Sequence, residues 1–295
     1  MEKRASNNGS CRRLPEWLKR PAPKGEQYKR VARVLGDLQL ATVCASASCP
    51  NQGECYSAGT ATFMIMGAVC TRNCRFCGVR HGDTSPLSSD EPQRLAEAVK
   101  KLQLRHVVIT SVTRDDLADG GAQHFAAVIK AVRAETPAVT IEVLTPDFSG
   151  TREHVNTVCQ ARPNVFNHNI ETTRRLTPQI RSGADYDRSL AVLNQAAQHE
   201  NHPTVKSGFM LGLGETDDEI TQALRDLRQN GVEMLTIGQY LRPGKENLEV
   251  CKYYRPEEFK QIEKQAKQMG FAHAAAGPFV RSSYHAEASL KDVDG

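Results

Sequence analysis

The stretch TFMIMGAVCTRNCRFC, residues 62–77, places an apolar run directly before three cysteines. The run Thr62–Met66 has the composition of a short buried β-strand. Cys70, Cys74 and Cys77 follow it with the spacing C-x3-C-x2-C. Thiolates are soft metal ligands, and catalytic loops in α/β barrels follow the C-terminal ends of strands. The stretch therefore predicts a metal centre on the first strand-to-helix loop of such a fold.

A second triplet, Cys44, Cys49 and Cys55, precedes the apolar run with the spacing C-x4-C-x5-C. Each triplet is one ligand short of a four-cysteine site. Structural zinc sites normally complete four ligands, whereas an iron–sulfur cluster held by three cysteines keeps one iron open to a substrate or cofactor. The pattern favours two such clusters, and a zinc-stabilised scaffold remains the alternative.

Composition limits the classes of protein that fit. The chain has 295 residues, 39% of them hydrophobic, which is enough for one large α/β barrel or two smaller domains. The net charge of +4 does not demand nucleic-acid binding, and no apolar run reaches the roughly 18 residues of a membrane span. The N-terminus lacks an apolar signal segment, and the clustered cysteines suit a reducing compartment. We expect a cytoplasmic protein that binds neither nucleic acid nor membranes.

From residue 61 the chain alternates between predicted strands and helices. The predicted strands are 62–66, 106–111, 140–144, 165–170, 205–211 and 235–240. The predicted helices are 91–103, 121–134, 151–160, 187–199, 216–229 and 256–269, with an earlier helix near 27–38. Six β–α units in sequence predict a parallel sheet, in the form of a partial (β/α)6 barrel related to the TIM barrel. We expect an N-terminal extension over 1–60, the barrel over 61–270 and a C-terminal extension over 271–295.

Polar residues and glycines follow the ends of several predicted strands. Glycines after the fifth strand would let the backbone approach a flat adenine, and Arg181 would pair with a carboxylate. Because these strand ends meet at one edge of the sheet, we expect them to share one small-molecule site. The candidate cofactor-binding residues are Thr113, Asp115, Asn169, Glu171, Arg181, Gly212, Gln239 and Tyr240.

The cysteine motifs carry a family resemblance. The spacing C-x3-C-x2-C, with Phe76 before its last cysteine, resembles the signature of the radical S-adenosylmethionine (SAM) superfamily. The added C-x4-C-x5-C triplet and the closing motif RSSY, residues 281–284, resemble the lipoyl synthase family. The motifs TRDDL (113–117), HNIET (168–172) and LGLGET (211–216) extend this resemblance, which covers about residues 14–286.

The resemblance implies a ligand set and a reaction. Cys70, Cys74 and Cys77 would hold a SAM-cleaving [4Fe–4S] cluster. The first triplet would hold an auxiliary [4Fe–4S] cluster with Ser283 as fourth ligand, and Ser282 is the competing candidate. A 5′-deoxyadenosyl radical would abstract hydrogen from C6 and C8 of a protein-bound octanoyl-lysine, and the auxiliary cluster would supply the two sulfurs.

The resemblance also implies protein partners. The octanoyl group would be carried by the lipoyl domain of a 2-oxoacid dehydrogenase E2 subunit or by the glycine cleavage H protein. A reduced ferredoxin or flavodoxin would donate electrons. Since lipoyl domains in this pathway are often acidic, we expect the basic arm over 12–33 to contribute to carrier binding. Its most N-terminal members are Arg12, Arg13, Lys19 and Arg20.

Two segments depart from the usual family pattern. Ala45 and Ser46 stand where acidic residues are common, and PGKENLE at 243–249 replaces a Pro-Ser…His-Leu-Pro version. Neither departure removes a ligand, but both leave open a divergent paralogue with altered specificity. The alternatives in function are another radical SAM sulfur-inserting enzyme and a two-cluster electron-transfer protein. The other cysteines are interpreted as ordinary thiols: Cys11, Cys159 and Cys251.

Overall fold

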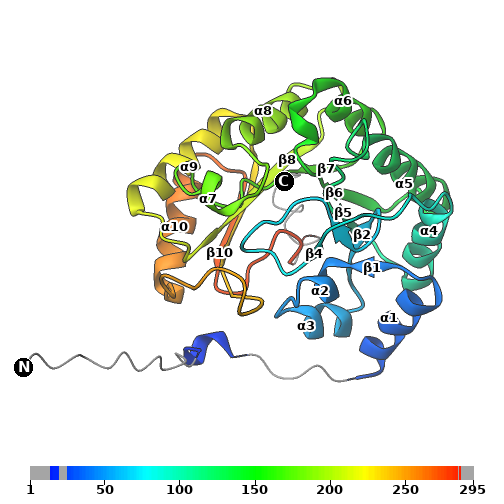
Figure 1. Cartoon of the computed structure of the whole chain (residues 1–295), viewed down its shortest axis with the longest axis horizontal. Helices are drawn as coiled ribbons and strands as arrows, with labels where there is room; N and C mark the ends of the chain where they lie inside the picture. The colour runs from blue at the N-terminus through cyan, green and yellow to red at the C-terminus, as the bar shows by residue number, and fades with distance from the viewer. Residues whose placement is uncertain (1–13, 20–24, 285, 287–295) are drawn as a thin grey trace, which may run out of the picture.

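The computed structural model describes residues 14–19, 25–284 and 286 (Figure 1). Outside them lie four residues that the sequence singled out: Cys11, Arg12, Arg13 and Arg20. Residues 287–295 of the expected C-terminal extension lie outside them as well. Lys19, the described member of that group, forms an exposed ion pair with Glu16.

One eight-stranded sheet organises the fold, in the order β1-β2-β5-β6-β7-β8-β9-β10. The strands are β1 (Ala41–Thr42), β2 (Thr62–Ile65), β5 (His106–Ser111), β6 (Thr140–Leu144), β7 (Val165–Asn167), β8 (Thr204–Leu211), β9 (Met234–Gln239) and β10 (His273–Gly277). β1 runs antiparallel to β2, and all other neighbours are parallel. β3 (Val69–Cys70) pairs with β4 (Arg80–His81) in a separate ribbon that brackets the second cysteine triplet.

Helices α4, α5, α6, α8, α9 and α10 surround the sheet as an outer ring, and α1–α3 lie beside its β1 edge (Figure 1). The α-helices are α1 (Glu26–Asp37), α2 (Val43–Ser46), α3 (Gln52–Ser57), α4 (Glu91–Leu102), α5 (Ala122–Glu135), α6 (Arg152–Gln160), α7 (Thr177–Ile180), α8 (Tyr186–Ala197), α9 (Asp217–Gln229) and α10 (Pro256–Gln268). Two 3-10 helices, η1 (Glu16–Leu18) and η2 (Phe148–Gly150), complete the described elements. The six predicted strands and six predicted barrel helices are confirmed, and the largest difference is at β7, which ends at Asn167 instead of residue 170.

The sheet contains a seventh parallel strand that the sequence did not predict. β10, with the sequence HAAAG, pairs along β9 from His273 opposite Met234 to Gly277 opposite Gly238. Alanine and glycine are poor strand formers, so the segment carries no periodic signal, and its pairing comes from the neighbouring strand. β10 lies inside the segment expected to be a C-terminal extension, and it delivers the chain directly to the closing motif.

A buried charged network crosses the barrel interior. Lys206 on β8 donates from Nζ to Glu142 on β6 at 2.9 Å, and both side chains are almost completely buried. His106 and Asn167 also contact the Glu142 carboxylate, each at 3.2 Å. Burial alone would raise the pKa of Glu142, but Lys206 and His106 lower it to about 2. Leu144 lies two residues further along β6 on the same face of the strand, and it lines a cavity at the C-terminal ends of the strands. The network therefore supports the strand that carries this part of the cavity wall.

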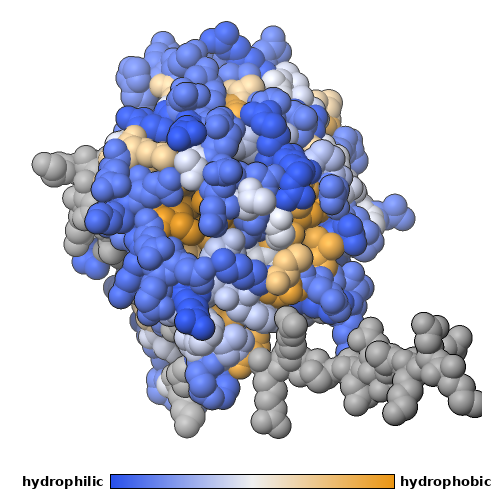
Figure 2. Space-filling view, turned by 90° about the vertical axis from the view of Figure 1, so that its left-hand side faces the viewer, coloured by the Kyte–Doolittle hydropathy of each residue, from blue (hydrophilic) through white to orange (hydrophobic). Residues whose placement is uncertain are grey.

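The face drawn in Figure 2 is mainly hydrophilic, with hydrophobic residues in small separate patches. Large exposed hydrophobic side chains among the described residues are Leu14, Trp17 and Leu87. Within residues 14–19, 25–284 and 286, no helix is both long enough and apolar enough to cross a membrane.

Replacing Lys206 with methionine should destabilise the fold by about 3–5 kcal/mol, because it leaves the buried Glu142 carboxylate without its cation. The control is Lys100→Met, which breaks an exposed pair with Glu135 at 2.9 Å. That variant should cost less than about 1 kcal/mol. Anaerobic urea denaturation followed by circular dichroism measures both changes. Equal losses in the two variants would contradict a structural role for the buried network.

Candidate functional site

One cavity of about 460 Å³ brings together most of the residues predicted to be functional. Four parts of the chain form its walls. They are the first cysteine region (residues 43–62), the second cysteine loop (70–79), the C-terminal ends of the strands and the closing segment (278–284). The predicted site residues that line it are Cys44, Cys49, Cys70, Cys74, Cys77, Thr113, Asn169, Glu171, Arg181, Tyr240 and Ser283. Four predicted residues are absent from the lining: Cys55, Asp115, Gly212 and Gln239.

Backbone amides point at the sulfurs of the second triplet. Cys70 Sγ accepts from the amides of Arg72 at 3.4 Å and Thr113 at 3.3 Å. Cys77 Sγ accepts from the Val79 amide at 3.5 Å. Burial raises the pKa of Cys77 to about 12, and the amide of Val79 offsets part of that rise. A thiolate in this loop therefore needs a nearby positive centre, and a metal cluster with three thiolate ligands fits that donor set.

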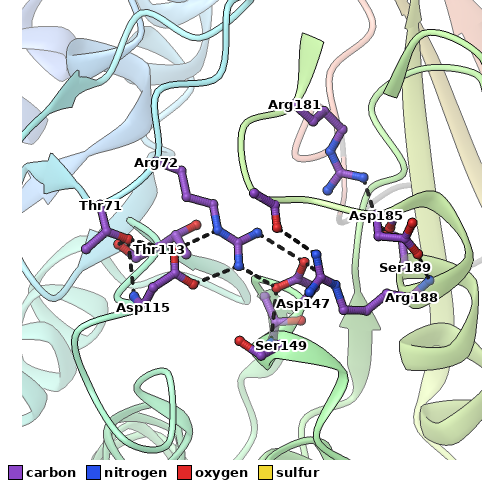
Figure 3. A network of polar contacts seen from close by, with 12 residues as sticks. Thr71, Arg72, Thr113, Asp115, Asp147, Ser149, Arg181, Asp185, Arg188 and Ser189 are labelled. Atoms are coloured by element: carbon purple, nitrogen blue, oxygen red, sulfur yellow. Dashed lines mark hydrogen bonds and ion pairs between the residues drawn. The ribbon is translucent and has the colours of Figure 1, made fainter. Parts of the chain in front are cut away.

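An ion-pair network fixes the second cysteine loop to the strand ends (Figure 3). Arg72 donates from Nη2 to Asp115 at 2.7 Å and to Asp147 at 2.8 Å. Arg188, on α8, also contacts the Asp147 carboxylate at 3.1 Å. Burial alone would lower the pKa of Arg72, but Asp115 and Asp147 raise it; burial alone would raise the pKa of Asp147, but Arg72 holds it at about 2. The loop is thus anchored by a charged, bidentate clamp between Cys70 and Cys74.

The segment 243–249, which departs from the family pattern, packs on the other side of this loop. Asn247 donates from Nδ2 to the carbonyls of Arg75 at 3.2 Å and Cys77 at 3.0 Å. A Cβ added to Gly78 would come 3.0 Å from Pro243, so the two segments touch closely. The departure in sequence therefore lies against the second triplet.

The closing segment returns to the first cysteine region. Asn51 donates to the Phe279 carbonyl at 2.6 Å, and the Tyr284 hydroxyl donates to Glu54 at 2.7 Å. Thr62 donates from its hydroxyl to Ser283 Oγ at 2.7 Å. Cys44 is buried, and its thiol is hydrogen-bonded to the backbone and side chain of Thr62. Ser283 is therefore linked to Cys44 through one shared residue.

Ser282 faces the opposite side of the cavity from Ser283. Its Oγ accepts from Asn169 Nδ2 at 2.7 Å, and the same amide donates to Glu171 at 3.0 Å. The two serines thus belong to different groups of residues, one on the first cysteine triplet and one on the β7 end.

The segment after β7 holds two ionisable residues, Glu171 and Arg181, which interact electrostatically. Burial raises the pKa of Glu171, and Arg181 opposes that rise. Glu171 has a φ of 61°, a left-handed conformation that costs energy in a residue other than glycine and is common at binding sites. Arg181 donates from Nη1 to the Ile170 carbonyl at 3.1 Å and to Ser189 at 3.0 Å. The arrangement presents a carboxyl group, an amide and a guanidinium to one part of the cavity.

Some predicted cofactor contacts are occupied by the protein itself. Gln239 is buried, and its Nε2 donates to three carbonyls within 3.1 Å, namely those of Leu211, Tyr240 and Lys252. A Cβ at Gly212 would come within 2.3 Å of that amide, so Gly212 makes room for Gln239. Asp115 is engaged by Arg72, and the Tyr240 hydroxyl donates to the Leu248 carbonyl at 2.8 Å. Of these four residues Tyr240 lines the cavity, and the contact of all four with a cofactor stays a prediction.

Four residues of the site were missed by the sequence argument: Thr62, Arg72, Asp147 and His168. Asp147 had a detectable signal, because it is a carboxylate that closely follows the third predicted strand. His168 stands in the HNIET motif but was not among the candidate site residues, and its Nδ1 lies 2.9 Å from the Thr145 carbonyl. Its Nε2, however, is buried at the cavity wall without a hydrogen-bond partner among the described residues. Because Nδ1 must donate to that carbonyl, Nε2 is left as an acceptor for a ligand.

Within the described part of the chain, no three His, Cys, Asp or Glu side chains converge closely enough to hold a single metal ion.

Two family models match this chain. The model of the radical SAM superfamily matches residues 64–227. The model of the N-terminal domain of lipoyl synthase, within the radical SAM family, matches residues 1–49.

Curated relatives match over nearly the full length. The lipoyl synthase of Rubrobacter xylanophilus is 53% identical over 279 residues, which is 95% of this chain and 87% of the relative. The lipoyl synthase of Caldanaerobacter subterraneus is 52% identical over 283 residues, which is 96% of this chain and 99% of the relative.

Solved structures share the fold at low sequence identity. HydG, a maturase of the [FeFe]-hydrogenase, matches with a TM-score of 0.56 and 15% identity, over 84% of this chain and 62% of its own. SuiB of Streptococcus suis, bound to the precursor peptide SuiA, matches with a TM-score of 0.57 and 11% identity, over 72% of this chain and 48% of its own. These likenesses show the fold alone.

The histidine at the cavity wall should stay neutral at physiological pH. Burial, reinforced by Arg181, lowers the pKa of His168 from 6.5 to about 4. Since the unfolded chain then binds a proton that the folded chain does not, His168 makes the fold less stable as the pH falls from 6.5 towards 4. Deuterium exchange at the imidazole C2 position, followed by mass spectrometry, should titrate near pH 4. A midpoint near 6.5 would contradict the buried placement.

The clamp on the second cysteine loop should govern iron retention. Arg72→Gln removes the bidentate cation of the buried Asp147 and should destabilise the fold by about 3 kcal/mol, whereas Arg188→Gln leaves that cation in place and should cost less. Only Arg72 belongs to the cysteine loop, so only its variant should also lose iron during anaerobic gel filtration. Iron analysis per chain tests this difference. Equal iron content in both variants would show that the clamp is merely structural.

Proposed function

This chain belongs to the lipoyl synthase family of the radical SAM superfamily, and we propose that it inserts two sulfur atoms, at C6 and C8, into an octanoyl chain carried on a lysine of a lipoyl-carrier protein. The observation that carries the proposal is the contact between Thr62 and Ser283, which joins the closing motif to the first cysteine triplet in the cavity that also contains the second.

The activity uses two [4Fe–4S] clusters and SAM. When bound, the SAM cluster and SAM supply a radical that abstracts hydrogen, and the auxiliary cluster supplies the sulfur. We assign Cys70, Cys74 and Cys77 to the SAM cluster. Their position supports this assignment, because all three line the cavity and all three are hydrogen-bonded to backbone amides.

We assign Cys44, Cys49, Cys55 and Ser283 to the auxiliary cluster. Two observations support Ser283 over Ser282 as the oxygen ligand. Ser283 shares Thr62 with Cys44, whereas Ser282 is bonded to Asn169 on the β7 side. Cys55 lies on α3 outside the cavity lining, and the contact of Tyr284 with Glu54 brings the closing segment next to it.

Residues at the strand ends would bind and orient SAM. Asn169 and Glu171 are suited to ribose hydroxyls, because the buried Oδ1 of Asn169 has no partner among the described residues and both it and the Glu171 carboxylate can accept hydrogen bonds. Arg181 carries the buried positive charge that a carboxylate requires. The neutral Nε2 of His168 accepts one further donor from the ligand. The apolar side chains of Met64, Val112 and Leu144 line the same cavity and would exclude water from the reacting chain.

The family implies a lipoyl-carrier substrate and a reductant. We propose an E2 lipoyl domain or the glycine cleavage H protein as the carrier, and reduced ferredoxin or flavodoxin as the donor. A zinc scaffold and a two-cluster electron carrier, which the cysteine count alone left open, do not account for the match to lipoyl synthases over 95% of the chain.

Anaerobic single turnover with SAM, a reductant and an octanoyl-lysyl peptide tests the proposal. Thiolated product should form with matching loss of auxiliary sulfide. Cys44→Ala should still cleave SAM, because the second triplet is intact, but should give no thiolated product. Full sulfur insertion by Cys44→Ala, or product without loss of sulfide, would contradict the assignment.

A further inference from the structure

The Thr62 hydroxyl occupies a junction between the two ends of the proposed auxiliary site. The side chain is 4% exposed, and its Oγ1 donates to Ser283 Oγ at 2.7 Å. Both the backbone amide and the side chain of Thr62 are hydrogen-bonded to the Cys44 thiol. One threonine thus contacts a cysteine and the serine that the proposed function assigns to one cluster.

Thr62 belongs to the central sheet, whereas Ser283 lies in a turn. The β2 strand that begins with Thr62 is paired on both sides, with Phe63 opposite Thr42 and Thr62 opposite Val108. Ser283 follows β10 in a turn segment that lines the cavity. A Cβ added to Gly238 would come 2.2 Å from the Val280 carbonyl, so this segment rests directly on β9. The strand therefore provides the fixed point to which the serine is held.

The chemistry of an oxygen ligand requires that Thr62 donates and Ser283 accepts in this hydrogen bond. A serine hydroxyl binds iron strongly only after it loses its proton, and its oxygen then accepts hydrogen bonds but cannot donate one. Thr62 already donates to that oxygen in this structure. The Thr62 hydroxyl carries one hydrogen, which this structure directs to Ser283 Oγ, and a Cys44 thiolate keeps the backbone amide of Thr62 as a donor. Asn169 is occupied with Ser282 and Glu171 on the other side.

We propose that Thr62 is a positioning residue for the auxiliary cluster, which holds Ser283 as an oxygen ligand through its hydroxyl. The proposal rests on the proposed function, because it takes Ser283 as the fourth ligand. The hydrogen bond sets how firmly the serine is held, and so how readily one iron corner opens when the cluster gives up sulfur. A hydrogen bond to a charged oxygen is strong enough to change that equilibrium about tenfold.

The test compares Thr62→Val with Thr62→Ser. Valine keeps the β-branched form and the strand preference of threonine but removes the hydroxyl, whereas serine keeps the hydroxyl. Both are made in the full chain with Cys70, Cys74 and Cys77 replaced by alanine, so that only the auxiliary cluster contributes. Four irons per chain in this background establish that the cluster is bound. Mössbauer spectra of ⁵⁷Fe-loaded protein then resolve the oxygen-ligated iron from the three sulfur-ligated ones.

Thr62→Val should weaken the oxygen-ligated component and release its first iron to a chelator roughly tenfold faster, and Thr62→Ser should match the background. Ser283→Ala separates the two levels of the argument. If Ser283→Ala changes the spectrum and Thr62→Val does not, the role of Thr62 is overturned and the ligand assignment stands. If Ser283→Ala leaves the spectrum unchanged, the assignment of Ser283 itself is wrong.

Discussion

Three hydrogen bonds between the closing segment and the first cysteine region hold the proposed site together. They join Asn51 to Phe279, Glu54 to Tyr284 and Thr62 to Ser283, across 228, 230 and 221 residues of sequence. Bringing such distant segments together has an entropic cost. Folding of the barrel offsets this cost, because the strands that precede the two segments, β1 and β10, belong to the same sheet. Without this return of the chain, the first triplet has three thiols and no nearby oxygen from the closing motif.

The barrel makes the return possible through its open edge. β1 and β10 are the two outer strands of the sheet, and the first triplet follows β1 while the closing motif follows β10. The parallel strands between them bring the second triplet, Glu171 and Arg181 to the same cavity. The two adjacent serines, which point to different groups, mark the boundary between the part of the cavity assigned to SAM and the part assigned to sulfur donation.

Sequence reasoning recovered what depends on local pattern. The strands β2, β5, β6, β7, β8 and β9 are apolar runs followed by helices, and the cysteine spacings are chemical signatures, so both were predictable. β10 was missed because HAAAG has no strand signal of its own. Arg72 and Thr62 were missed because their roles arise from partners 43 to 221 residues away, which no local pattern specifies. Gln239 was predicted to contact a cofactor because it is polar and lies at a strand end. Its amide instead donates to the carbonyls of Leu211 and Lys252, which no local pattern specifies.

The positions of the irons relative to the two cysteine triplets and Ser283 test the proposed site most directly. They can be measured by anomalous diffraction at the iron edge, from crystals of anaerobically prepared protein. Two groups of four iron peaks are expected in one cavity. One group should lie beside Cys70, Cys74 and Cys77, and the other beside Cys44, Cys49 and Cys55 with Ser283 Oγ bonded to its fourth iron. A single group of peaks, or a second group whose fourth iron is bound by anything other than Ser283, would contradict the proposed site.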